Sequence, residues 1–501
     1  MKVDVLQEPS LVFRHGQAVD DPRDGLSLFG PFDTDATSHP RNISYAVVGA
    51  PQGLDAFAEW ARALNTPLVA EGLDHRLWPP FPGFDVAFNT SWPAKPTRQS
   101  EIAEGRLADL ARNVDPSRRA ADVVDIYLDA IRRMTTGDAK ADLIVCVVPD
   151  LVYESCRPES HIKDPTGTPI TFHERKARQR GQTSLFDPVD PKIYRYSVDF
   201  RRQIKARVME YKTPIQIIRE STLRLQDVPE PTARVRGLSP LSDRAWNLST
   251  ALYYKAGGLP WKLGTAREGV SYVGIAYRCA EQSGKWGRRT ACCAAQMFLD
   301  SGDGIVFLGE FGPWYSPEKK EFHLTKEAAR KLVEGVLRTY REQEGRPLKE
   351  LFIHCRSRLS RGEFEGFAEG APSDVKVVAV RVQQDRSGVR AFREGRWPVL
   401  RGTWWRSEER SAFLWASGFK PRLGTYDGWE VPIPLRIDIQ HGDADIETVG
   451  RDILGLTKLN FNACRLGEGQ PVTVRYSDAV GEILVANPEV GARLPNFRYY
   501  I

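Results

Sequence analysis

The chain has 501 residues, of which 41% are hydrophobic and 27% are charged, and its formal net charge at pH 7 is +5. These values are typical of a soluble globular protein, and the length excludes a single ordinary domain, so two or three domains are expected. The sequence has no run of about 18 apolar residues and does not begin with the basic and then apolar pattern of a signal peptide. We therefore expect a cytoplasmic protein that does not enter a membrane.

The first predicted elements alternate between strand and helix. Residues 1–40 are rich in turn-forming residues, and residues 44–65 predict a strand, a turn and an amphipathic helix. A second helix is predicted at 120–134, and the apolar run at 141–149 predicts a buried strand. This alternation predicts an α/β fold with a parallel, Rossmann-like sheet. The G-x-G-x-x-G pattern is absent, so no dinucleotide site is expected in this layer. We expect no organic cofactor in this chain.

Cations and an amide converge in the stretch from residue 201 to 264. Arg201 and Lys205 are four residues apart on one face of a predicted helix, and Gln216 follows on an apolar strand. Lys255 ends the next predicted helix, just before two glycines. A terminal phosphate needs cationic donors, and its oxygens also accept hydrogen bonds from a neutral amide. Each charge taken alone also fits an ordinary solvated helix surface.

The local distribution of charge favours a site that binds phosphate. Between residues 173 and 224 the sequence has thirteen Lys or Arg and six Asp or Glu, although the net charge of the chain is too small to decide on a partner. A partner with a phosphate backbone is the natural inference. A solvated basic loop is the alternative, above all for residues 173–182.

A second unit is predicted to begin near residue 266. Its predicted elements are strands at 271–278, 290–311, 351–355 and 375–382, with a glycine-rich hairpin turn at 301–304 and a helix that Thr325 caps. Mixed strands followed by alternating helix and strand predict an RNase H-like α/β layer.

Two parts of the sequence resemble Argonaute proteins. The order of Arg201, Lys205, Gln216 and Lys255 is similar to the guide 5′-phosphate pocket of the MID domain. The segments similar to the PIWI domain are 400–419, 432–439, 454–463 and 471–484. The likeness is closest to short prokaryotic Argonautes, which have MID and PIWI domains but no N and PAZ domains. It implies an N-terminal segment packed with MID at 1–110, a MID domain at 111–265 and a PIWI domain at 266–501.

The resemblance also implies contacts with a guide strand. In most Argonautes a ring stands at the position of Arg201 and stacks on the first guide base, and a guanidinium plane can also stack. The carboxylate of Ile501 is expected beside the guide phosphate, where two anions need a cation, most plausibly Mg²⁺ with oxygen ligands. A simple buried end of the chain is the other interpretation of this tail. Asn462 and Arg475 are candidates for contacts with the guide backbone.

Whether the chain can cleave nucleic acid depends on the residues that occupy the positions of the PIWI catalytic acids. A slicing PIWI domain needs carboxylates around two divalent metals. The first acid is replaced by Ala276 and the second by Arg356, which would repel a metal, so only Asp478 is left. One carboxylate cannot assemble such a site, and Asp478 is interpreted as a remnant or a surface residue. The alternative is an active nuclease that uses other acids together with Asp478, namely Glu310, Asp374 or Asp385.

The function that the resemblance implies is a catalytically inactive sensor in prokaryotic defence against plasmids and phage. It would hold a guide RNA and recognise complementary single-stranded DNA by base pairing. The output would come from a partner in which an APAZ domain is fused to an effector, with a TIR domain as first choice and a sirtuin or nuclease as alternatives. Target binding would then trigger oligomerisation of the heterodimer and NAD⁺ depletion. Silencing by target occupancy without a partner is a further alternative.

Overall fold

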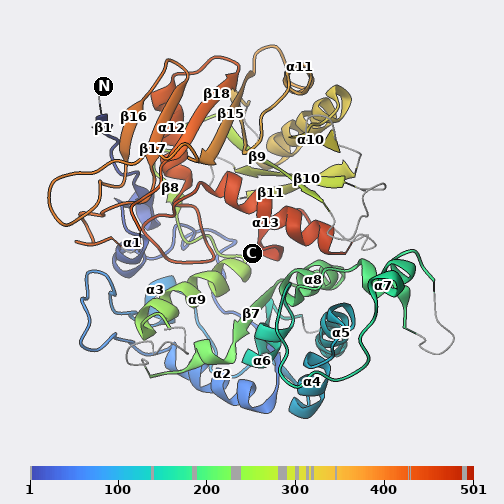
Figure 1. The fold of residues 1–501 in the computed structure, drawn as a ribbon. Helices are drawn as coiled ribbons and strands as arrows, with labels where there is room; N and C mark the ends of the chain where they lie inside the picture. Colours follow the sequence, from blue (N-terminus) through green and yellow to red (C-terminus); the bar gives the residue numbers. More distant parts are fainter. Residues whose placement is uncertain are drawn as a thin grey trace.

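The structure is a computed structural model and describes residues 3–136, 140–182, 189–226, 238–279, 290–298, 304–311, 315–316, 321–344, 347–426, 428, 430–487 and 494–501. It contains a four-stranded sheet and a nine-stranded sheet, each with helices packed against it. Figure 1 shows the two sheets in separate halves of the molecule, with the last residues of the chain between them. This position of the C-terminal residues places them beside elements of both halves.

The four-stranded sheet is parallel throughout and has the order β5-β4-β6-β7. Its strands are β4 (Tyr45–Gly49), β5 (Arg98–Glu101), β6 (Leu143–Val148) and β7 (Ile215–Arg219). Its helices are α2 (Pro51–Ala63), α4 (Glu104–Ala111), α5 (Pro116–Thr135), α6 (Asp150–Ser155), α8 (Phe200–Val208) and α9 (Leu241–Lys255). The predicted Rossmann-like layer is therefore present.

Neighbouring residues of a strand in this sheet point to opposite faces, and both faces are covered. On β6, Val145 belongs to the core that includes Trp60 of α2 and residues of α9. The next residue, Cys146, belongs to the core that includes Tyr127 of α5 and residues of α8. Because both faces are buried, the strand is apolar at every position, as its sequence predicted.

The nine-stranded sheet has the order β1-β16-β17-β18-β15-β14-β9-β10-β11. Five of its strands are β9 (Val270–Cys279), β10 (Thr290–Phe298), β11 (Gly304–Phe311), β14 (Glu350–Cys355) and β15 (Lys376–Gln384), with β11 at one edge. Three more are β16 (Thr403–Arg406), β17 (Ser411–Trp415) and β18 (Leu435–His441). The β14 strand pairs in parallel with β9 and β15, whereas β10 pairs antiparallel with both β9 and β11. This mixed sheet agrees with the RNase H-like α/β layer that the sequence predicted.

The helices of this half cover both faces of the nine-stranded sheet. They are α10 (Lys326–Glu344), α11 (Arg361–Glu369), α12 (Ile446–Leu456) and α13 (Val472–Ala486). The helices α10 and α11 share one core with β9, β14 and β15, and α12 and α13 belong to the core on the other face. Within the described residues, no helix is long and apolar enough to cross a membrane.

The N-terminal part of the chain contributes to both halves. Strand β1 (Val3–Val5) pairs antiparallel with β16 at the edge of the large sheet. A small sheet follows, with β2 (Leu11–Val12), β3 (Ala18–Val19) and β8 (Lys262–Leu263). Strands β4 and β5, which also precede residue 111, are half of the parallel sheet.

Local sequence signals explain two of the helix starts. The Thr325 Oγ1 atom accepts a hydrogen bond from the backbone N–H of Ala328 (3.2 Å), as expected for the residue that caps α10. Residues 173–182, for which a solvated loop was one interpretation, lie largely in helix α7 (Phe172–Gln179). Thr171 and Glu174 form a capping box at its start.

Residues 301–303 of the predicted hairpin turn lie outside the described residues.

Gly274 allows α13 to pack closely on β9. A Cβ atom at this position would lie 1.7 Å from the main-chain oxygen of Thr473. We expect Gly274→Ala to lower the free energy of unfolding by about 1–3 kcal/mol, because the helix must move away from the strand. Gly335 of α10 is the matched control, since no atom lies within 4 Å of a Cβ added there. Gly335→Ala should raise stability by about 0.5–1 kcal/mol in the same urea titration, and equal effects of the two changes would contradict the packing argument.

Candidate nucleic-acid interface

Helix α8 carries the first two predicted cations. The carboxylate of Asp199 caps it by accepting a hydrogen bond from the backbone N–H of Arg202 at 3.0 Å. Arg201 is exposed, whereas Lys205, one turn later, is only 3% exposed. The Nζ atom of Lys205 donates a hydrogen bond to the main-chain oxygen of Tyr500 at 3.1 Å. The helix thus directs Lys205 toward the last residues of the chain.

Lys255, the last residue of α9, reaches the same place from another direction. It is 1% exposed, and its Nζ atom donates hydrogen bonds to the main-chain oxygens of Ile215 (2.9 Å) and Ile501 (2.5 Å). Ile215 begins β7, and Ile501 follows the short helix η5 (Phe497–Tyr499). The structure therefore brings together α8, α9, β7 and the C-terminal residues around two buried ammonium groups.

Gln216 lies on β7, directly after the residue whose oxygen Lys255 binds. Its Nε2 atom donates a hydrogen bond to the main-chain oxygen of Ile217 at 3.2 Å. Its Oε1 atom is buried, and no donor reaches it within the part of the chain that the structure describes. A buried amide oxygen without a donor is costly, so this group is suited to a ligand or a water molecule that supplies one.

The cations influence one another because little water separates them. Burial, and after it the charge of Arg201, lowers the pKa of Lys255 to about 7. Burial and the charges of Arg201 and Lys255 lower the pKa of Lys205 well below its usual range. Among the described residues, no carboxylate side chain offsets either effect, and the hydrogen-bond partners of both ammonium groups are main-chain oxygens.

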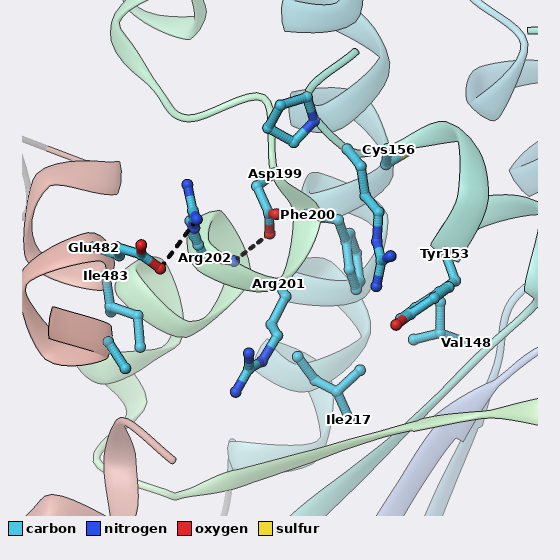
Figure 2. A pocket seen from close by; sticks show the side chains of 13 residues that line it. Val148, Tyr153, Cys156, Asp199, Phe200, Arg201, Arg202, Ile217, Glu482 and Ile483 are labelled. Atoms are coloured by element: carbon cyan, nitrogen blue, oxygen red, sulfur yellow. Dashed lines mark hydrogen bonds and ion pairs between the residues drawn. The ribbon is translucent and has the colours of Figure 1, made fainter. Parts of the chain in front are cut away.

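A pocket of about 300 Å³ opens beside this cluster. It lies where α6, α8 and α13 meet, at the carboxyl end of β6 and beside the middle of β7. Figure 2 shows the side chain of Arg201 extending beside Ile217, with Tyr153 and Val148 beyond them. Arg202 forms an ion pair with Glu482 of α13 at 3.0 Å, so this side of the pocket joins the two halves of the molecule (Figure 2).

Two arginines, Arg157 and Arg219, lie over the ring of Tyr153 in the pocket, and the sequence analysis predicted no role for these residues. The Cζ atom of Arg157 lies 3.4 Å from the ring centroid of Tyr153, and that of Arg219 lies 4.1 Å from it. The only sequence signal for Tyr153 was its position shortly after the buried strand β6, because ligands of parallel sheets bind at the carboxyl ends of the strands.

Ala276, Arg356 and Asp478, which the sequence resemblance placed at the positions of the PIWI catalytic acids, lie close together in the large sheet and on α13. Cys355, the last residue of β14, pairs with Ile275 of β9, and Arg356 and Ala276 are the residues that follow them. The Nη1 atom of Arg356 lies 2.5 Å from the Oδ2 atom of Asp478 on α13. Arg278, two residues beyond Ala276, lies 3.1 Å from the same carboxylate. The side chain of Asp478 is 17% exposed, and its charge is offset by two arginines.

The other carboxylates considered for a metal site occupy separate positions. Asp374 precedes β15 and Asp385 follows it, about 30 Å away along the strand. The oxygens of Asp385 accept hydrogen bonds from Ser387 and Val389. Glu310 lies in β11, and its side chain is outside the described residues. Where the structure describes side chains, no three His, Cys, Asp or Glu residues are grouped so as to hold a metal ion.

The two candidates for guide-backbone contacts have partners within the protein. The Nη1 atom of Arg475 lies 2.7 Å from the Oε2 atom of Glu468. The backbone N–H of Asn462 donates a hydrogen bond to the side chain of Asn460 at 2.9 Å. Both residues are at least partly accessible, and their contact with a guide stays a prediction.

No protein-family model and no curated protein matches the sequence. Solved structures do match the fold, which is the mixed α/β fold of the MID and PIWI domains of Argonaute proteins. One of them is Clostridium butyricum Argonaute bound to a guide DNA and a 19-mer target DNA, with a TM-score of 0.61 and 14% identity. The match covers 100% of this chain and 55% of that one.

Aquifex aeolicus Argonaute is a second structural neighbour, with a TM-score of 0.57, 15% identity and coverage of 100% of this chain and 57% of that one. A structure of Aa-Ago with externally bound siRNA has a TM-score of 0.55 and 15% identity, and covers 99% of this chain and 56% of that one. This chain thus spans about half the length of the structures that it matches.

Proposed function

We propose that this chain binds the 5′-phosphorylated end of a guide strand and thereby recognises a complementary single strand. The observation that carries the proposal is the pair of buried ammonium groups of Lys205 and Lys255, which have main-chain oxygens as hydrogen-bond partners. Two buried ammonium groups with Arg201 beside them carry more positive charge than the Ile501 oxygen at Lys255 can offset, even where that oxygen belongs to a carboxylate, so a further anion stabilises them. A phosphate dianion does so, and Arg201 and Gln216 add a third cation and an amide beside it.

The pocket next to these cations is the place proposed for the first nucleotide of the guide. Its volume of about 300 Å³ and its position at the carboxyl end of β6 favour a small ligand, such as the nucleoside that is attached to the 5′ phosphate. The structure of Clostridium butyricum Argonaute, which holds a guide and a target DNA, supports nucleic acid as the ligand class. By the sequence resemblance, the guide is RNA and the target is single-stranded DNA.

A Mg²⁺ ion is proposed between the guide phosphate and Ile501. The main-chain oxygen of Ile501 already lies against the ammonium group of Lys255. A chain that ends at Ile501 places a carboxylate at this point, and Mg²⁺ bridges such an oxygen and a phosphate well. Its chemical role there is to neutralise two neighbouring anions.

We further propose that the chain does not cut the target. Arg278 and Arg356 surround Asp478, so the charge near these positions favours anions rather than divalent cations. The output is proposed to come from an APAZ-containing partner, most plausibly with a TIR domain, that oligomerises and consumes NAD⁺ in prokaryotic defence. The sequence resemblance alone supports this part. Co-expression with the neighbouring reading frame tests it, because target DNA should then cause loss of NAD⁺, and an unchanged NAD⁺ level would contradict it.

The binding proposal is tested with one guide strand in two forms. A 5′-phosphorylated strand should bind at least about a hundredfold more tightly than the same strand with a 5′-hydroxyl group, because each charge-assisted hydrogen bond contributes about 1.5–3 kcal/mol. Fluorescence anisotropy at fixed ionic strength gives both dissociation constants. Equal affinities would contradict a phosphate pocket at Lys205 and Lys255.

The affinity for a 5′-phosphorylated strand should also depend on pH. The pKa of Lys255 is lowered to about 7 in the free protein, so Lys255 is increasingly neutral as the pH rises above 7. A phosphate favours its protonated form, and binding therefore takes up a proton. We expect the affinity to fall between pH 7 and pH 9 by up to about tenfold per pH unit. The 5′-hydroxyl strand is the control, and an equal pH dependence for both strands would contradict this role of Lys255.

A further inference from the structure

The loop between β15 and β16 presents an unusual concentration of arginine. Residues 386–396 contain four arginines and one glutamate. The arginines are Arg386, Arg390, Arg393 and Arg396, and all four are exposed. Among the described residues, none of the four forms an ion pair with a carboxylate, in contrast to Arg361 of α11 and Arg451 of α12, which pair with glutamates of their own helices. This positive charge therefore faces solvent unopposed.

A single aromatic ring projects from the same loop. Phe392 is 77% exposed, more than any other large hydrophobic residue whose side chain the structure describes. An apolar ring among arginines does not contribute to the core. It provides a flat surface against which another ring system can stack.

The base of this loop is held firmly, so these side chains are presented from a fixed support. The backbone N–H of Asp385 donates a hydrogen bond to the main-chain oxygen of Pro434 at 2.9 Å. The carboxylate of Asp385 accepts hydrogen bonds from the backbone N–H groups of Ser387 (3.1 Å) and Val389 (3.0 Å). Val389 also packs against the small core that contains Phe413.

Two of the arginines are oriented by rings. The Cζ atom of Arg393 lies 4.7 Å from the ring centroid of Phe419, and that of Arg396 lies 5.0 Å from the ring of Trp397. Trp397 and Phe419 are stacked with centroids 5.4 Å apart. A guanidinium group that lies over a ring keeps its N–H donors at its edge, where they can bind phosphate oxygens.

We propose that residues 386–396, which we name the arginine loop, bind single-stranded nucleic acid. The arginines contact backbone phosphates, and Phe392 stacks on an unpaired base. A single strand fits better than a duplex, because the base faces of a duplex are already stacked. The arginine loop does not include Lys205 or Lys255, and its binding needs no 5′ phosphate, so this inference goes beyond the proposed guide function.

The test uses the full chain without guide and fluorescent oligonucleotides that carry a 5′-hydroxyl group, as single-stranded DNA, single-stranded RNA and duplex DNA. Phe392→Ser should weaken binding of single strands by roughly fivefold or more and leave duplex binding unchanged. The double variant Arg386→Ser and Arg390→Ser should reduce the slope of log affinity against log salt by about 1.4. The double variant Arg361→Ser and Arg451→Ser is the control and should leave both quantities unchanged.

Other outcomes of these binding measurements would overturn the proposal or identify the strand that is bound. Unchanged binding of single strands by both loop variants would overturn the proposal, and so would an equal loss in the control. A loss of binding to poly-glutamate with no loss for oligonucleotides would assign the loop to an acidic protein partner and overturn it as well. A loss confined to DNA or to RNA supports the proposal and identifies the strand. The affected residues are exposed, so thermal unfolding should stay within about 2 °C of wild type. Failure of the 5′-phosphate preference, with the loop effects intact, would overturn the guide proposal alone.

Discussion

Replacing Lys205 and Lys255 together with methionine should lower the affinity for a 5′-phosphorylated strand by about 3–6 kcal/mol, or roughly two to four orders of magnitude in Kd. Both side chains are buried, and the exposed Arg201 then remains as the cation beside the phosphate. Methionine keeps most of the length and the apolar stem of lysine. Because burial disfavours the charged form of both lysines, the free protein should be as stable as wild type or more stable.

Anisotropy with the phosphorylated strand measures this loss, and thermal unfolding of the free protein measures stability. Lys212→Met is a suitable control, because Lys212 is an exposed lysine just beyond α8. It should change the affinity by less than twofold, as expected for a solvated charge. Wild-type affinity in the double variant, with the fold intact, would show that the phosphate binds elsewhere.

Glu8→Ala should lower the free energy of unfolding by about 3–5 kcal/mol, because it leaves two buried cations without their carboxylate. The side chains of Arg401 and Lys458 are 1% and 0% exposed. Arg401 Nε and Lys458 Nζ each donate a hydrogen bond of 2.9 Å to the carboxylate of Glu8. This contact holds the N-terminal segment against the large sheet.

The same contact predicts a pH dependence of stability. Burial acts to raise the pKa of Glu8, but the charges of Arg401 and Lys458 outweigh it and lower the pKa below its usual value of 4.5. The stabilisation is therefore complete at neutral pH and is lost as the pH falls below about 4.5. Urea titrations at pH 7 and pH 4 measure both effects. Glu447→Ala, which removes an exposed pair with Arg451, should cost less than about 0.5 kcal/mol, and an equal cost for Glu8→Ala would contradict the argument.

Much of the fold was predictable because its strands are apolar or alternate with clear helices. The run that became β6 is apolar at every position, as a strand buried on both faces must be. The pairing of β1 with β16 was not predictable, because three exposed residues carry no pattern and their partner is about 400 residues away in the sequence. The sequence contains the capping box that starts α7, formed by Thr171 and Glu174. Because the segment is rich in basic residues, a solvated loop was considered there instead.

The residues of the candidate site could be predicted from the sequence, but their burial and their hydrogen-bond partners could not. The spacing of Lys205 and Lys255 suggested a phosphate site, yet only the structure shows that both are buried and bind main-chain oxygens. Arg356 was expected to repel a metal, and the structure adds that it pairs with Asp478. The contribution of Arg278 could not be foreseen, because the pair joins a strand and a helix that are distant in the sequence.

We propose that the chain recognises nucleic acid through a guide and leaves it intact. The most direct measurement loads the chain with a 5′-phosphorylated guide RNA, adds labelled complementary single-stranded DNA with Mg²⁺, and records binding and DNA length in the same sample. We predict tight binding that requires both the 5′ phosphate and complementarity, with the DNA at full length. Cut DNA from the purified chain would contradict the interpretation of Ala276, Arg356 and Asp478, and binding that is independent of the guide phosphate would contradict the site at Lys205 and Lys255.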